Sequence, residues 1–186
     1  MASVRPVFPV SPSASPLPSG YRLTLPAEVH FGQGGRRVTP AVPSKNGSKR
    51  ENIHVYAGRR DGLAAMLRIL LVASGAPRLY RRIRMVRRGN AMGHEDERCA
   101  FHHARLTWTV YHRTAHASRY GDRHNYHGGG EALYDALQLS GWVLDDRHLT
   151  IDLPVLAVDR AAPRVVLDLV AVSQGEETPT DAGVQE

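Results

Sequence analysis

Three aspartates in the second half of the chain could together form a cation-binding site. Asp122 opens the tetrad D-R-H-N, and Asp145 and Asp146 follow the G-W-V-L segment further along the chain. Loop carboxylates that converge bind hard cations such as Mg²⁺, which activates water and neutralises the charge of a phosphate. Each acid taken singly also suits a turn or a cap, so the spacing alone leaves both interpretations open.

The charge of the chain is distributed unevenly. Residues 1–98 hold 17 Lys and Arg against 6 Asp and Glu, a net +11, whereas residues 99–186 hold 7 against 12, a net −5. Lys45 and Lys49 are the only lysines, and arginine is well suited to bidentate phosphate contacts. A basic half that attracts phosphates and an acidic half that binds cations fit an enzyme acting on nucleic acid. The alternatives are a coding bias toward arginine and simple attraction between the two halves.

Two basic segments are the candidates for contacting a nucleic-acid backbone. In the first segment, residues 78–88, the apolar residues Leu79, Ile83 and Val86 stand among the arginines. This pattern indicates either an amphipathic basic helix or a basic strand-like extension. The alternative is an ordinary solvated face. The arginines of the first segment are Arg78, Arg81, Arg82, Arg84, Arg87 and Arg88, and the second, a Gly-rich loop, carries Arg36, Arg37, Lys49 and Arg50.

The sequence pattern predicts an α/β (α+β) fold: a single domain over residues 21–172 with one mixed sheet and flanking helices. Residues 1–20, rich in Pro and Ser, are expected to be a disordered leader, and residues 173–186 a disordered acidic tail. The predicted strands are 21–25, 105–111, 149–156 and 164–172. The predicted helices are 61–74, capped by Asp61, and 131–139, and the predicted loops are 31–60, 90–98 and 112–130.

The composition also bears on the cellular compartment. Cys99 is the only cysteine, so no intrachain disulfide can form and a reducing cytoplasm is expected. The most apolar stretch, residues 63–73, is interrupted by Arg68 and is too short to cross a bilayer. We therefore expect a cytoplasmic protein without a membrane partner.

The stretch from Asp122 to Leu149 resembles the core of the RusA-like Holliday junction resolvases, a family of phage and prophage endonucleases. In that family an Asp/Asn motif is followed by a helix ending in D-A-L, a glycine turn and a D-D pair before a strand. The spacer after Asn125 is longer than in the best-known members, as in a variant branch. The resemblance covers residues 104–172, and the matching residues are Asp122, Asn125, Asp135, Ala136, Leu137, Gly141, Asp145 and Asp146.

The resemblance implies a homodimeric, Mg²⁺-dependent endonuclease that nicks four-way DNA junctions, with Mn²⁺ as the alternative ion. It assigns the metal and the catalysis to Asp122 and Asp146, with Asp145 as a further candidate, and Asn125 would orient the loop. A two-fold symmetric junction suits a two-fold symmetric enzyme.

Two positions depart from the family pattern. His124 stands where the family has a second acid, and Glu131 stands where it has a lysine. Our hypothesis is that Glu131 replaces the missing acid as a metal ligand, since its charge would otherwise repel Asp135 one turn away. The alternative is that Glu131 only starts an exposed helix, and the chain is a non-catalytic relative that still binds DNA junctions.

Several histidines raise the further possibility of a zinc-dependent binding module. His94, Cys99, His102 and His103 form the pattern H-x4-C-x2-H-H, which fits no zinc module. In a strand, His102 and His103 would point to opposite faces. We therefore expect surface histidines or histidines that face DNA.

Overall fold

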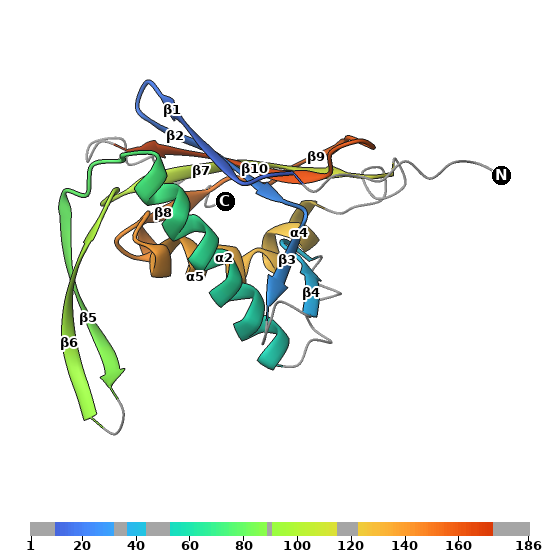
Figure 1. The fold of residues 1–186 in the computed structure, drawn as a ribbon. Helices are drawn as coiled ribbons and strands as arrows, with labels where there is room; N and C mark the ends of the chain where they lie inside the picture. Colours follow the sequence, from blue (N-terminus) through green and yellow to red (C-terminus); the bar gives the residue numbers. More distant parts are fainter. Residues whose placement is uncertain (1–9, 32–36, 44–52, 89–90, 115–122, 173–186) are drawn as a thin grey trace, which may run out of the picture.

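The computed structural model describes residues 10–31, 37–43, 53–88, 91–114 and 123–172 (Figure 1). The strands are β1 (Ser13–Leu17), β2 (Gly20–Pro26), β3 (Glu28–Phe31), β4 (Arg37–Pro40), β5 (Tyr80–Arg88), β6 (Ala91–Cys99), β7 (Ala104–His112), β8 (Leu149–Ile151), β9 (Val155–Val158) and β10 (Arg164–Ala171). The helices are α2 (Ile53–Ala73), α4 (Arg123–Gly129), α5 (Glu131–Ser140) and the short 3₁₀ helix η2 (Asp146–His148).

A six-stranded mixed sheet organises the chain, which confirms the predicted fold class. Its order is β1-β2-β10-β7-β8, and β9 pairs with β7 beyond the end of β8. β10 runs antiparallel to both β2 and β7, whereas β8 and β9 run parallel to β7. β3–β4 and β5–β6 are separate two-stranded ribbons.

The sheet is buried on one face. Alternate residues of β7 point into the core: Leu106, Trp108 and Val110 are buried. Helices α2 and α5 pack together on this face (Figure 1). The opposite face carries ion pairs, such as the bidentate contact between Arg22 and Asp168. This one-sided burial is typical of a sheet that contains antiparallel strands.

The segment between α5 and η2 holds several elements together. Gly141 ends α5 in the left-handed conformation, with φ 86°, which glycine adopts without steric cost. Trp142 follows and is fully buried, and its indole nitrogen donates to the carbonyl of Leu67 in α2 at 2.9 Å. Val143 forms a parallel bridge with Phe101, just before β7. This segment therefore fixes η2 relative to α2 and to the start of β7.

Part of the predicted leader is ordered, so the prediction of disorder for residues 1–20 is wrong there. β1 pairs with β2 along its whole length, from Ser13 opposite Thr24 to Leu17 opposite Gly20. Pro16 is tolerated because β1 is the edge strand of the sheet. The prediction of a strand at 21–25 is confirmed by β2, and residues 1–9 and the predicted tail 173–186 lie outside the described residues.

The predicted loop at 31–60 is also wrong in part. β3 and β4 form a hairpin within it, and α2 begins at Ile53 instead of at the predicted cap Asp61. Tertiary contacts stabilise the early turns of α2: Arg59 is buried and donates to the hydroxyl of Thr39 in β4 at 2.6 Å. Asp61 lies within the helix and pairs with Arg60.

Two further predictions differ from the structure along the second half of the chain. The predicted loop at 112–130 contains helix α4. The predicted strand at 149–156 is split into β8 and β9, because Pro154 lacks the N–H that a continuous ladder needs. The predicted helix at 131–139 and strands at 105–111 and 164–172 are confirmed.

The basic segment 78–88 contributes a strand, the second of its two predicted forms. β5 pairs with β6 in an antiparallel ribbon that extends away from the sheet and helices (Figure 1). The predicted loop at 90–98 is therefore wrong: β6 is polar, but its acids lie in register with the arginines of β5. Arg82 lies opposite Glu97, and Arg84 opposite Glu95. Opposite charges across a ribbon stabilise the pairing without apolar alternation.

Arg82 attaches the root of this ribbon to the rest of the protein. Its guanidinium forms an ion pair with Glu97 and donates to the carbonyls of Gln138, at 2.9 Å, and Leu144, at 3.0 Å. The Arg82 side chain is only 12% exposed, whereas the neighbouring Arg81, paired with Asp96, is 66% exposed. The ribbon is thus held against the end of α5 and the residue before Asp145.

We predict that Arg82→Ala destabilises the protein by about 2–3 kcal/mol, because it removes charged hydrogen bonds and leaves Glu97 half-buried without its partner. Arg81→Ala is the matched control and should cost less than about 1 kcal/mol, since its ion pair is exposed. Chemical denaturation gives both values, and equal losses for the two variants would contradict this role of Arg82.

Candidate functional site

Asp145 and Asp146 lie at the entrance to β8. Asp145 is the N-cap of η2: it accepts a hydrogen bond from the backbone N–H of Arg147 at 3.0 Å. Both of its carboxylate oxygens also accept from the Arg147 guanidinium, at 3.0 and 2.9 Å. These contacts hold the pKa of Asp145 well below its usual range. Asp145 is therefore an ionised carboxylate with a side-chain partner of its own.

Asp146 has the opposite electrostatic situation. Burial raises its pKa, and so do a side-chain hydrogen bond with Asp145, the charge of Asp145 and the charge of Asp135. Removal of solvent and nearby negative charge both disfavour an ionised carboxylate. A bound cation would relieve this cost, so Asp146 is the described acid best placed to gain from a metal ion.

Helix α5 places one further acid, Asp135, within electrostatic reach of Asp146 in η2. Asp135 accepts a hydrogen bond from the hydroxyl of Tyr56 in α2 at 2.8 Å. The pKa of Tyr56 is raised, first by burial and then by its hydrogen bond to Asp135. Glu131 lies one turn earlier on α5 and is exposed. The acid of α5 that raises the pKa of Asp146 is thus Asp135, which the sequence analysis did not propose as a site residue, while Tyr56 carried no sequence signal.

The remaining predicted site residues are only partly described. Asp122 lies outside the described residues, as does the side chain of Asn125. His124 is exposed in the first turn of α4. β7 and β8 are neighbours, as the convergence of the acids requires, but they run parallel, so the start of β8 lies beside the start of β7. The loop after β7 leaves from the opposite end, so pairing of these strands alone does not bring Asp122 to Asp146.

The predicted DNA-binding arginines and Lys49 divide into three groups, according to how much of each residue the structure describes. Arg78 and Arg81 are exposed at the root of the ribbon, while Arg82 holds the ribbon in place. The backbone of β5 carries Arg84, Arg87 and Arg88, whose side chains are not described, and Arg37 has the same status in β4. The other three candidates, Arg36, Lys49 and Arg50, lie outside the described residues.

The histidines are arranged differently from the predicted H-x4-C-x2-H-H set. His94 is exposed on β6 and Cys99 is buried at the end of that strand. His102 and His103 occupy a bend before β7, not a strand, and both rings stack on His148 at the end of η2. Burial and the adjacent His148 and His102 lower the pKa of His103, which favours its neutral form. His148 was not among the predicted candidates, because its partners are distant in sequence.

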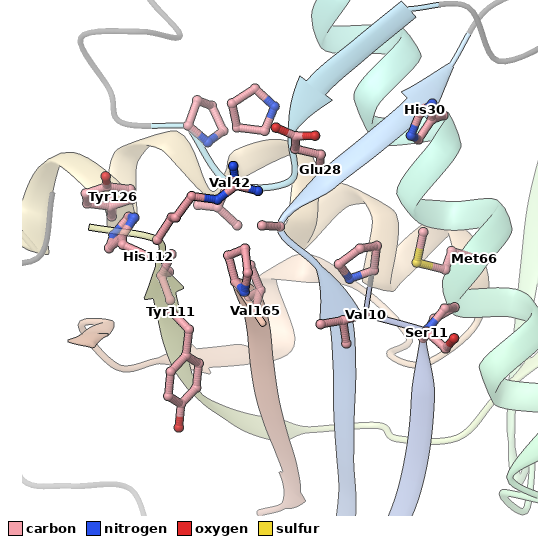
Figure 2. Close-up of a pocket in the computed structure, with 18 residues that line it drawn as sticks. Val10, Ser11, Glu28, His30, Val42, Met66, Tyr111, His112, Tyr126 and Val165 are labelled. Atoms are coloured by element: carbon pink, nitrogen blue, oxygen red, sulfur yellow. The ribbon is translucent and has the colours of Figure 1, made fainter. Parts of the chain in front are cut away.

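A cavity of about 830 Å³ lies at the other end of β7 (Figure 2). Among its lining residues are Glu28, His30, Tyr111, His112 and Tyr126. The ring of His112 is 5.2 Å from that of Tyr126, and burial lowers the pKa of His112. Asp145, Asp146, Asp135 and Glu131 do not line this cavity.

Comparison with known proteins gives no relative: no family model, curated protein or solved structure matches this chain. Within the described residues, no helix is long and apolar enough to cross a membrane.

The two adjacent aspartates should affect stability in opposite directions. At neutral pH Asp145→Ala should destabilise the protein by about 1 kcal/mol, because it removes a cap. Asp146→Asn should stabilise it by about 0.5 kcal/mol, because it removes repulsion between like charges. Thermal unfolding in EDTA measures both.

The pH dependence follows from the two pKa shifts. The contribution of Asp145, whose folded pKa is lowered, is present above the unfolded pKa of about 3.9 and is lost as the pH falls below that value. The contribution of Asp146, whose folded pKa is raised, is present below about pH 3.9 and is lost as the pH rises through its folded pKa. The advantage of Asp146→Asn should therefore disappear in acid. A destabilised Asp146→Asn at pH 7 would contradict this assignment.

Proposed function

We propose that this protein is a metal-dependent endonuclease that cuts branched DNA, with the four-way junction as its preferred substrate. The observation that carries the proposal is the attachment of the basic ribbon beside the acids. Arg82 donates to Leu144, the residue before Asp145, and to Gln138, three residues after Asp135. A phosphate-attracting arm and a cation-attracting centre are thus fixed to the same few residues.

The acids have the chemistry that Mg²⁺ requires. Carboxylate oxygens are its preferred protein ligands, and Mn²⁺ accepts them equally. In our proposal Asp146 is the central ligand, and Asp122, which lies outside the described residues, is the second. Asp145 would then contribute by adding negative charge beside Asp146, and Glu131 remains a candidate for a further ligand from α5. The cation supplies neutralisation of the scissile phosphate and activation of the attacking water.

The chain's own residues would position this reaction. The Asp145 cap and the buried Trp142 hold η2 in place, so the Asp146 carboxylate has a fixed position. Tyr56 would orient Asp135 through its hydrogen bond, and the charge of Asp135 contributes to the raised pKa of Asp146. Preorganised electrostatics of this kind require no rearrangement at the moment of reaction.

The ribbon would bind the DNA backbone through its outer half. Along β5, Arg82 and Arg84 lie opposite acids, whereas Arg87 and Arg88 lie opposite the uncharged Met92 and Ala91. The arginine positions without an acid directly opposite in register are therefore those farthest from the attachment point. Contacts with phosphates there would be independent of sequence and sensitive to salt. A homodimer would present two such arms to the two-fold axis of a junction.

One observation favours a second function, a non-catalytic protein that binds DNA junctions. Both oxygens of Asp145 are already engaged by Arg147, so only Asp146 of the pair is left to hold a cation. His124 and Glu131, which stand where the resembled family has an acid and a lysine, point in the same direction.

Cleavage of a labelled four-way junction in Mg²⁺, Mn²⁺ or EDTA separates the two functions. We expect metal-dependent nicking by the wild type, and a loss of at least about 100-fold for Asp122→Asn and Asp146→Asn, since ligand changes exceed the 10–100-fold effects of outer-shell changes. Asp168→Asn is the matched control, because this acid pairs with Arg22 on the opposite face of the sheet. Tight junction binding without nicking would leave only the non-catalytic function, and absence of any preference for the junction over a linear duplex would contradict both.

The contribution of the arm can be measured separately from cleavage. Replacing Arg87 and Arg88 by Gln should weaken junction binding and reduce the slope of log K against log salt by about 1–2, since each lost phosphate contact removes about 0.9. Arg160→Gln, an exposed arginine between β9 and β10, should leave the slope unchanged. An unaltered slope for the double variant would place the DNA elsewhere.

A further inference from the structure

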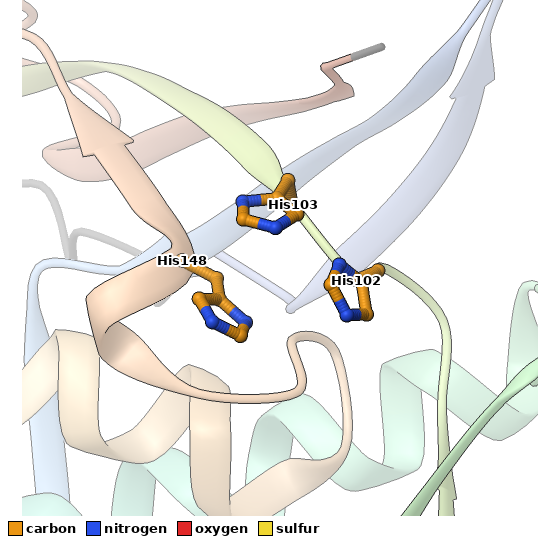
Figure 3. A group of neighbouring side chains, drawn as sticks. All are labelled: His102, His103 and His148. Atoms are coloured by element: carbon orange, nitrogen blue, oxygen red, sulfur yellow. The ribbon is translucent and has the colours of Figure 1, made fainter. Parts of the chain in front are cut away.

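Three histidines from two distant segments meet beside the start of the central sheet. His102 and His103 lie in the bend before β7, and His148 ends η2, just before β8 (Figure 3). Pairing of β8 with β7, with Leu149 opposite Ala104, places the bend and the 3₁₀ turn side by side. Within the described residues, these histidines form a group whose candidate ligand nitrogens all lie within 4.8 Å of one another.

The three rings lie close enough together to converge on one ion if their side chains rotate. Ring centroids are 4.4 Å apart for His103 and His148, 4.5 Å for His102 and His103, and 5.0 Å for His102 and His148. Imidazole nitrogens about 2.0–2.1 Å from a tetrahedral ion lie about 3.3 Å from one another. The rings would therefore have to turn to converge on an ion, and the second side-chain torsion of histidine is soft.

A second, independent observation points to a ligand. The Nδ1 atom of His148 is buried and has no hydrogen-bond partner among the described residues. A buried polar atom without a partner costs free energy, and an ion or a water is the usual explanation for one. The backbone N–H of His148 bonds to the carbonyl of Asp145, which keeps the main chain of this histidine fixed.

We propose that His102, His103 and His148 form a site for a divalent transition-metal ion, with Zn²⁺ as the first candidate. Three neutral imidazoles suit Zn²⁺, Co²⁺, Ni²⁺ or Cu²⁺ and discriminate against Mg²⁺, which prefers oxygen ligands. With three protein ligands, the ion keeps a fourth position for water or an anion, including a phosphate oxygen. The site is separate from the carboxylate centre in ligand type, although His148 is only two residues from Asp146.

The ion would join two segments of the structure and lie near the root of the ribbon. His102 and His103 belong to the segment that leads into β7, His148 belongs to η2, and the ring of Tyr80 at the root of the ribbon lies 5.5 Å from that of His102. An ion bound only in the folded state raises stability by mass action. Metal binding and the stability of the fold can both be measured without the proposed nuclease activity.

The test is metal binding by the purified full chain, measured by calorimetric titration with Zn²⁺ and by elemental analysis after dialysis. We expect one Zn²⁺ per chain and a rise in the unfolding temperature of about 5–10 °C at 100 times Kd. Each of His102→Ala, His103→Ala and His148→Ala should weaken binding by at least about 100-fold. His148→Gln, which keeps a polar group of similar size, should weaken it equally and guards against loss through misfolding.

Matched controls separate this site from other histidines and from the carboxylates. His94→Ala, an exposed histidine of the ribbon, and Asp146→Asn should both retain one Zn²⁺, and excess Mg²⁺ should not displace it. Absence of Zn²⁺ binding by the wild type would overturn the proposal. Equal binding by the folded triad variants, or loss of binding in Asp146→Asn, would overturn it as well, because the ion would then lie elsewhere.

Discussion

The buried Trp142 and its hydrogen bond to Leu67 are the constraint on which the arrangement of the site depends. Trp142 follows the left-handed Gly141 that ends α5, and its own carbonyl accepts from Phe101 at 2.9 Å. One residue beyond the bridge at Val143, the carbonyl of Leu144 accepts from Arg82. A single short segment thus joins helix α2, the approach to β7 and the root of the basic ribbon.

This connection places the basic ribbon next to the acids of η2 and α5. The positive ribbon is neutralised near its root, where Arg82 meets Glu97, and carries unopposed arginine positions toward its tip. At its base, burial, the hydrogen bond with Asp145 and nearby negative charge raise the pKa of Asp146. Raised carboxyl pKa values occur at functional sites and also in structural charge networks.

Much of the fold follows from local sequence patterns. The alternation of Leu106, Trp108 and Val110 predicts β7, and the helical period of Leu133, Ala136 and Leu137 with Gly141 after it predicts α5. β6 was not predicted because its pairing depends on acids that lie opposite the arginines of β5. The periodicity of either strand alone does not show this match of charges. The Gly89-Asn90 dipeptide was the available signal, since such pairs favour hairpins.

The site shows the same division between local and tertiary information. Their adjacency in the sequence marks Asp145 and Asp146 as candidates. The structure places both at the entrance to β8. The ion pair that occupies Asp145, the approach of Asp135 and the contact of Tyr56 all depend on how α2, α5 and η2 pack. His148 lies beside His102 and His103 because β8 pairs in parallel with β7. The spacing of these histidines in the sequence does not indicate this pairing.

We propose that Asp146 holds the cation that contacts the scissile phosphate of branched DNA. The most direct test of this proposal is a crystal structure of the protein bound to a four-way junction in Mn²⁺, with the ion located by anomalous scattering. We expect an Mn²⁺ ion coordinated by Asp146 and by a phosphate oxygen of the junction. A junction seated with its phosphates away from Asp146, or an Mn²⁺ ion bound to the junction without this carboxylate, would contradict it.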